Sequence, residues 1–192
     1  MDKRPKLSIV IPIHNMKGGS EFLWRSINML AEQSFKDFEI VITKDGKMAE
    51  NTNSGIKQAR GEFIKILYLD DMLAHKDALK EIVEAIDGNH WLINGCDTNP
   101  YPYYTDDIET GNNKLGSPSC LTIRNNDLIF FDEKMSWLLD CQYYKQMYEK
   151  YGEPVILDGI HVNMGIGEHQ VTNIMSLEEK EAEAVYLKQK YA

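Results

Sequence analysis

Two adjacent aspartates, Asp70 and Asp71, follow an apolar segment that ends at Leu69. Like charges at neighbouring positions repel each other, and the repulsion is larger where water is scarce. The pair therefore either faces solvent in a turn, where such residues are common, or surrounds a cation that offsets its charge. Taken alone, the two residues fit both interpretations.

Polar residues also follow two other apolar segments of the chain. His14 and Asn15 come after "KLSIVIPI", and Lys44 and Asp45 come after "FEIVIT". Apolar runs rich in β-branched residues are typical of buried strands. In open α/β sheets, ligands bind beyond the carboxyl ends of the strands. We therefore expect these residues and the aspartate pair to line one crevice.

The elements that position these residues alternate along the first half of the chain. Strands are predicted at residues 7–13, 38–43, 62–69 and 90–96, and amphipathic helices at residues 20–35, 49–61 and 76–88. We expect Ser20 to cap the first helix, and Gly61 and Gly88 to end the second and third. Strands that alternate with helices indicate βαβ units, so we predict an α/β fold with a mostly parallel sheet covered by helices.

The second half has a different pattern. Residues 99–118 are rich in Tyr, Asn, Asp, Gly and Pro, which indicates a long irregular segment. A strand at 119–125, a helix at 137–152, further strand character from 154 and a charged helix at 176–191 are predicted to follow. Because the sequence shows neither an internal repeat nor a separating linker, we predict one domain over residues 1–192.

Composition excludes several classes of protein. The chain has 192 residues, of which 43% are hydrophobic and 27% charged, so it can build one sizeable core. A net charge of −9 argues against nonspecific nucleic-acid binding. The 3 cysteines have no close spacing, which argues against a disulfide framework or a zinc site and favours the cytoplasm. No apolar run approaches the ~20 residues that cross a bilayer, so we expect no transmembrane segment.

The motifs, taken in order, resemble family 2 glycosyltransferases, which have the GT-A fold. They are "SIVIPIHN", "SINMLAEQSFKDFEIVITKDG", "NTNSGIKQARGEFIKILYLDD" and "FDEKMSWLLDCQYYKQMYEKYG", within residues 6–152. The resemblance implies a Rossmann-like, mostly parallel central sheet flanked by helices, with a smaller irregular acceptor-side half. Residues 1–97 would bind the nucleotide sugar, and residues 98–192 would face the acceptor.

The resemblance also implies a reaction and a set of site residues. The reaction is metal-dependent, inverting transfer from a nucleotide-sugar donor to an acceptor hydroxyl, assisted by Mn²⁺ or Mg²⁺. Asp70 matches an acidic metal ligand of the family's DxD motif, with Asp71 beside it and His169 as a third ligand. The residues expected to contact the nucleotide sugar are Pro12, His14, Asn15, Lys44, Asp45, Asn53, Tyr68, Leu69 and Asp70.

Asp140 matches the family's general base, which accepts a proton from the acceptor hydroxyl. Its other interpretation is an aspartate favoured in the first turn of a helix. The chain departs from the family at Leu139, where a glutamate is usual, and at Tyr68, where the first aspartate of the metal motif is usual. It departs again at Lys44, where an acidic residue often reads uracil. Because lysine cannot accept a hydrogen bond from the base, UDP is not assumed.

Two alternatives and the acceptor stay open at this stage. One alternative is a non-catalytic nucleotide- or sugar-binding module descended from a glycosyltransferase. The other is a sugar nucleotidyltransferase, although the basic, glycine-rich signature expected near its N-terminus is poorly matched. The acceptor would be a glycan, a lipid-linked molecule or another hydroxyl compound. The short chain would also suit a compact, phage-encoded enzyme that modifies a polymer or a nucleobase.

Overall fold

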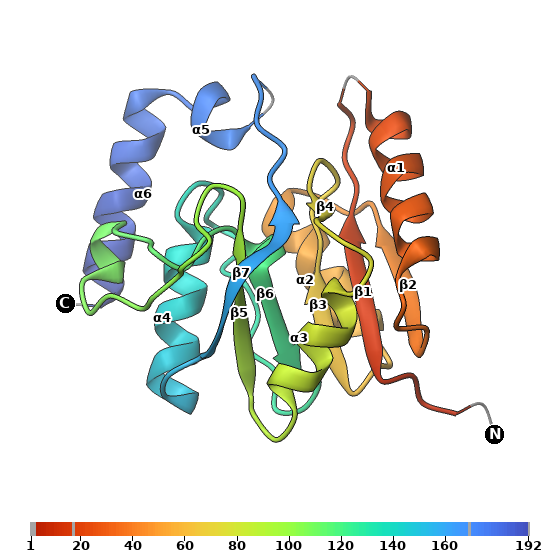
Figure 1. The fold of residues 1–192 in the computed structure, drawn as a ribbon. Helices are drawn as coiled ribbons and strands as arrows, with labels where there is room; N and C mark the ends of the chain where they lie inside the picture. Colours follow the sequence, from red (N-terminus) through yellow and green to blue (C-terminus); the bar gives the residue numbers. More distant parts are fainter. Residues whose placement is uncertain (1–2, 17, 169, 192) are drawn as a thin grey trace.

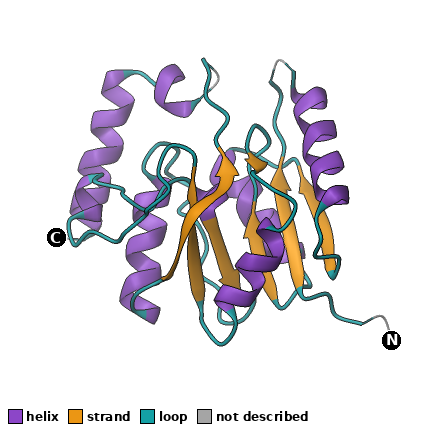
Figure 2. Ribbon diagram, viewed as in Figure 1, coloured by secondary structure: helices purple, strands orange, loops and turns teal. Residues whose placement is uncertain are grey.

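The computed structural model describes residues 3–16, 18–168 and 170–191. A central sheet is covered by helices on both faces, with α3 (Ala78–Ile86) in front of it and α2 (Met48–Gln58) behind it in Figure 1. Figure 2 shows the strands grouped at the centre with helices around them. Among the described helices, none is both long and apolar enough to span a membrane.

The sheet has seven strands in the order β2-β1-β3-β6-β5-β7-β4. Their bounds are β1 Leu7–Pro12, β2 Phe38–Thr43, β3 Phe63–Ile66, β4 Met72–Leu73, β5 Trp91–Cys96, β6 Leu121–Arg124 and β7 Val155–Asn163. The pairings give β1, β2, β3, β5 and β7 one direction, and β4 and β6 the opposite direction. The predicted mostly parallel α/β sheet is therefore confirmed. Strand β6 comes from the second half of the chain and pairs with two strands of the first half, so both halves share one sheet.

Strand β1 lies between β2 and β3 in the sheet, and all its residues are buried. Helix α2 packs closely on it through Gly55, where an added Cβ would lie 2.3 Å from Val10 Cγ1. Strand β2, which we predicted to be buried, is at the sheet edge instead. Its Ile40 and Ile42 side chains, which lie on the same face of the sheet, are exposed.

Of the three helix boundaries predicted from capping residues, two differ from the structure and one agrees with it. Helix α1 spans Gly19–Glu32 and is preceded by Gly18 with φ 78°, so Ser20 is not its N-cap. Helix α2 ends at Gln58 and not at Gly61, which is used for close packing: an added Cβ there would lie 2.5 Å from Ser8 N. Gly88, with φ 81°, follows α3 as predicted.

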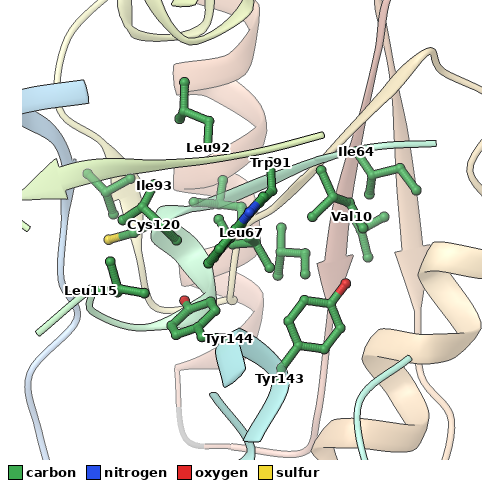
Figure 3. Close-up of a cluster of buried hydrophobic side chains, with 14 of the residues drawn as sticks. Val10, Ile64, Leu67, Trp91, Leu92, Ile93, Leu115, Cys120, Tyr143 and Tyr144 are labelled. Atoms are coloured by element: carbon green, nitrogen blue, oxygen red, sulfur yellow. The ribbon is translucent and has the colours of Figure 1, made fainter. Parts of the chain in front are cut away.

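The second half supplies the remaining helices. They are the short turns η1 (Ile108–Thr110) and η2 (Pro118–Cys120), α4 (Leu139–Tyr151), α5 (Val171–Ile174) and α6 (Leu177–Lys190). The hydroxyl of Ser176 accepts the N–H of Glu179, whose carboxylate accepts the N–H of Ser176, so a capping box starts α6. Figure 3 shows Tyr143 and Tyr144 of α4 beside Trp91 of β5 in the hydrophobic core.

Candidate active site

A cleft of about 580 Å³ lies at the carboxyl ends of β1 and β3. This is the upper edge of the sheet in Figure 1, where β7 also ends and where α5 lies. The cleft is lined by segments that are far apart in the sequence, including residues 46–51, 68–71, 117–118, 136–140 and 164–165. The cleft therefore lies where we predicted a crevice from the polar residues that follow the strands.

The structure brings most of the predicted site residues to this cleft. Those that line it are Pro12, His14, Tyr68, Leu69, Asp70, Asp71 and Asp140. Asn15, Lys44 and Asp45 are exposed near the same edge but do not line the cleft. His169 lies outside the described residues, so its predicted role as a metal ligand stays a prediction.

Asn53 is the predicted site residue that the structure places elsewhere. Its side chain is buried, donates to Phe131 O (2.9 Å) and Glu133 Oε1 (3.1 Å), and accepts the N–H of Phe131 (2.8 Å). These bonds anchor the segment before α4 to helix α2. Its amide is therefore committed inside the protein and does not face a ligand in the cleft.

Asn51 has the position that we expected for Asn53. It lines the cleft, donates to Ile13 O (2.8 Å) and accepts the N–H of Asp45 (2.9 Å). Residues two positions apart on a helix point about 200° apart, so Asn51 and Asn53 face opposite sides of α2. Both residues belong to one motif, "NTNSG". Their spacing of two positions on a helix could have shown that only one of them faces the cleft. Asn51 holds the loops after β1 and β2 together.

Asp71 is almost completely buried below the cleft surface, with 3% of its area exposed. Its Oδ1 accepts the N–H of Gly165 at 2.7 Å. Burial, and then repulsion from Asp70, raise the pKa of Asp71 to about 7, although hydrogen bonds from Ser119 and Gly165 oppose this. An added Cβ on Gly165 would lie 2.4 Å from Asp70 O, so the backbone after β7 packs directly on the aspartate pair.

Lys65 is a buried cation beneath the same pair. It lies in the middle of β3, and its Nζ donates to Ser119 O and Leu121 O. Burial lowers the pKa of Lys65 to about 8, while attraction to Asp71 is among the effects that oppose the shift. The Ser119 hydroxyl accepts the N–H of Tyr68 at 2.8 Å. Lys65 thus offsets part of the buried negative charge and fixes the turn that faces the aspartates.

Asp140 reaches the cleft from the second residue of α4. Its Oδ2 accepts the side-chain N–H of Asn113 at 2.7 Å, and its Oδ1 accepts the N–H of Cys141 at 2.7 Å. Burial raises the pKa of Asp140, and these hydrogen bonds oppose the shift. A carboxylate with a raised pKa is a stronger proton acceptor than an exposed one.

Asn113 was missed by sequence reasoning, because the irregular segment around it carries no periodic signal. Its Oδ1 accepts the N–H of Leu115 at 2.8 Å, and its Nδ2 donates to Gly116 O at 3.0 Å as well as to Asp140. This orientation is fixed by the backbone, so the amide can present only N–H to Asp140. The loop therefore positions the carboxylate.

Tyr68, which replaces the first acidic residue of the expected metal motif, faces this part of the cleft. Its hydroxyl is buried and has no hydrogen-bond partner among the described residues. Burial raises its pKa, and the charge of Asp140 adds to the shift. The side chain of Thr52 opposes this shift without cancelling it, so the hydroxyl stays protonated.

Together, the sheet order and the cleft define an α/β protein with a GT-A-like fold, the fold of glycosyltransferases. S. aureus TarS 1–349 in complex with UDP-GlcNAc superimposes with a TM-score of 0.70 and 19% identity, over 95% of this chain and 65% of that chain. The mannosyltransferase PcManGT from Pyrobaculum calidifontis, in complex with GDP-Man and Mn²⁺, has a TM-score of 0.67 and 11% identity, over 88% and 59%.

These similarities concern the fold of the chain. The chain spans between 37% and 65% of the length of the TarS and PcManGT chains that it matches. No protein-family model and no curated protein matches the sequence. At such low identities the likeness shows the fold, which confirms the predicted fold class, and membership of family 2 stays a prediction.

Proposed function

We propose that this protein is an inverting, metal-dependent glycosyltransferase that transfers a sugar from a nucleotide-sugar donor to an acceptor hydroxyl. The observation that carries the proposal is the meeting of Asp70–Asp71 and Asp140, on separate elements, at one cleft of about 580 Å³. This gives the cleft one acidic group for a cation and another for a proton. Complexes of two structural neighbours with UDP-GlcNAc and with GDP-Man and Mn²⁺ support it.

The aspartate pair fits a hard cation by its charge. Asp70 and Asp71 are adjacent, and their repulsion together with burial holds the pKa of Asp71 at about 7. A divalent cation would relieve this repulsion, and carboxylate oxygens are the ligands preferred by Mg²⁺ and Mn²⁺. Asp70 and Asp71 would hold the ion, with His169 as the proposed third ligand. When bound, the ion would neutralise the charge of the departing nucleoside diphosphate.

Asp140 is the proposed general base. As the acceptor oxygen bonds to the anomeric carbon, the bond to the diphosphate breaks, and Asp140 takes the hydroxyl proton. The Asn113 and Cys141 N–H groups hold the carboxylate in one orientation, which leaves the protein little reorganisation during the reaction. Asp140 and the aspartate pair lie on different elements, so base and donor site are separable by mutation.

Donor contacts are proposed for Pro12, His14, Tyr68 and Leu69, which line the cleft. The exposed Asn15, Lys44 and Asp45 would contribute only if a bound nucleotide extends beyond the lining. Acceptors are proposed by class: a glycan, a lipid-linked molecule or another hydroxyl compound. A cytoplasmic location is likewise a proposal, since the three cysteines are free.

The test is a panel of nucleotides and nucleotide sugars with and without Mn²⁺ or Mg²⁺. A native-state ligand raises the melting temperature by mass action, and nucleotide release in the presence of candidate acceptors reports transfer. The control variant Asp158→Asn should behave like the unmodified protein, because Asp158 is exposed and does not line the cleft. Metal-dependent donor binding with transfer supports the proposal. Donor binding without transfer for any acceptor would favour the non-catalytic binding module, and no binding would overturn both.

A further inference from the structure

A second group of ligating side chains lies outside the cleft. It consists of His75 in the loop after β4, Glu81 on α3 and His161 on β7, and their ligand atoms all lie within 4.8 Å of one another. His161 Nε2 is 2.9 Å from Glu81 Oε2, and His75 Nε2 is 4.0 Å from the same oxygen. None of the three lines the cleft. Two imidazole nitrogens and one carboxylate oxygen thus converge from three separate elements.

One member of the group is fixed and two are accessible. His161 is 3% exposed, and its carbonyl accepts the N–H of Ala74 at 2.8 Å, so β7 and the loop after β4 are joined at this residue. The side chains of His75 and Glu81 are 39% and 46% exposed. A buried histidine therefore directs its Nε2 to Glu81, next to two partly exposed side chains that have room to adjust.

We propose that His75, Glu81 and His161 form a binding site for a transition-metal ion of the Zn²⁺ class. Zinc binds imidazole nitrogen at ~2.0–2.1 Å and carboxylate oxygen at ~2.0–2.2 Å, with tetrahedral geometry. Ligand atoms around such an ion lie about 3.3 Å apart. The observed separations bracket this value, and the exposed His75 and Glu81 side chains can close the remaining distance. The fourth ligand is water, because the site opens to solvent.

The donor set separates this site from the cleft. Two imidazoles with one carboxylate favour Zn²⁺, Cu²⁺, Ni²⁺ or Co²⁺, whereas the proposed cleft set of two carboxylates and His169 is richer in oxygen and suits Mn²⁺ or Mg²⁺ better. An ion at the second site would tie α3 to the loop after β4 and to β7. Strand β4 follows Asp71 directly and pairs with β7. The ion would therefore stabilise the segment that continues from the aspartate pair.

The test is metal binding by tag-free, metal-stripped protein. We expect one equivalent of Zn²⁺ to bind in competition with a chromogenic chelator, and one equivalent of Co²⁺ to give the visible absorption of a tetrahedral complex. His75→Ala should weaken binding by about tenfold or more. Since His75 is exposed, this variant should keep the fold. Glu81→Gln should weaken binding in the same direction, because the amide is a poorer ligand for a cation.

Two control variants test whether Zn²⁺ binds at this cluster and not elsewhere in the protein. Asp70→Asn alters only the cleft and should bind Zn²⁺ like the unmodified protein. His90→Gln removes an exposed histidine that stacks on Tyr151, away from the cluster, and should also leave binding unchanged. If the unmodified protein binds no Zn²⁺ at micromolar concentration, or if His75→Ala binds it equally well, the three residues form only a hydrogen-bonded cluster and the proposal is overturned.

Discussion

Asp140→Asn separates the proposed catalytic role of Asp140 from its structural role. The amide oxygen can still accept the N–H of Cys141, but the amide nitrogen would face the N–H of Asn113. Asn113 cannot turn over easily, because its oxygen accepts the N–H of Leu115 at 2.8 Å. A lost hydrogen bond with one unsatisfied donor costs about 1–3 kcal/mol.

Removing the charge has the opposite effect on stability. Burial raises the pKa of Asp140, so its ionised form is less favourable in the folded protein than in the unfolded chain. The net loss of unfolding free energy should therefore stay below about 3 kcal/mol, within the range of ~5–15 kcal/mol that domains possess. The variant should fold.

Turnover should change far more than stability. A general base contributes roughly 10²–10⁴-fold to rate, which corresponds to about 2.7–5.4 kcal/mol of activation free energy. Because Asp140 acts in the transition state, kcat should fall while the donor Kd changes little. The measurements are nucleotide release during transfer and donor binding by calorimetry.

Asn113→Ala is the matched control for this experiment. It removes the hydrogen bond to Asp140 together with those to Leu115 and Gly116, so stability should fall at least as much as in Asp140→Asn. It leaves the Asp140 carboxylate in place, so kcat should fall by much less. If folded Asp140→Asn protein transfers sugar at a near-normal rate, or if the two variants lose equal activity, Asp140 is not the base. Glu133 and Asp132 would then be the next carboxylates to test.

Three further predictions concern the aspartate pair. Asp70→Asn should weaken Mn²⁺-dependent nucleotide binding because an amide supplies no charge; an unchanged Mn²⁺ requirement would remove Asp70 from the metal site. Gly165→Ala should lower both the melting temperature and Mn²⁺-dependent binding, since its Cβ would lie 2.4 Å from Asp70 O; normal values for both would show that the loop relaxes freely. The pKa of Asp71 rises from 3.8 to about 7 on folding, so the folded state binds the extra proton between these values and metal-free stability should fall as pH rises from about 4 to 7. Asp71→Asn should reduce that slope in thermal unfolding, and an unaltered slope would contradict the raised pKa.

The order of elements and part of the site could be predicted because they depend on local patterns. The buried run of β1 and the polar residues after β1 and β3 indicated where strands end, and Asp70, Asp71, His14 and Asp140 do line one cleft. The strand-end residues need only side-chain periodicity and the rule that ligands bind beyond the carboxyl ends of strands, whereas Asp140 was expected from the resemblance to glycosyltransferases.

Other features depend on contacts between distant parts of the chain. Strand β2 lies at the sheet edge and its Ile40 and Ile42 are exposed on one face, although the apolar composition of the strand predicted burial. Asn51 and Asn53 share one motif, but the packing of α2 turns one toward the cleft and the other toward Phe131. The sequence alone did not show which side of helix α2 faces the cleft.

The charge environment of the site was also decided by tertiary structure. Asp71 is bonded to Gly165, 94 residues further along the chain, and Asp140 is oriented by Asn113 from an irregular segment. Burial and hydrogen bonding set a pKa through all the groups around a side chain, whichever part of the chain supplies them. The sequence by itself therefore determined which residue types the strand ends carry, whereas folding decided which of them share a cleft and how acidic each one is.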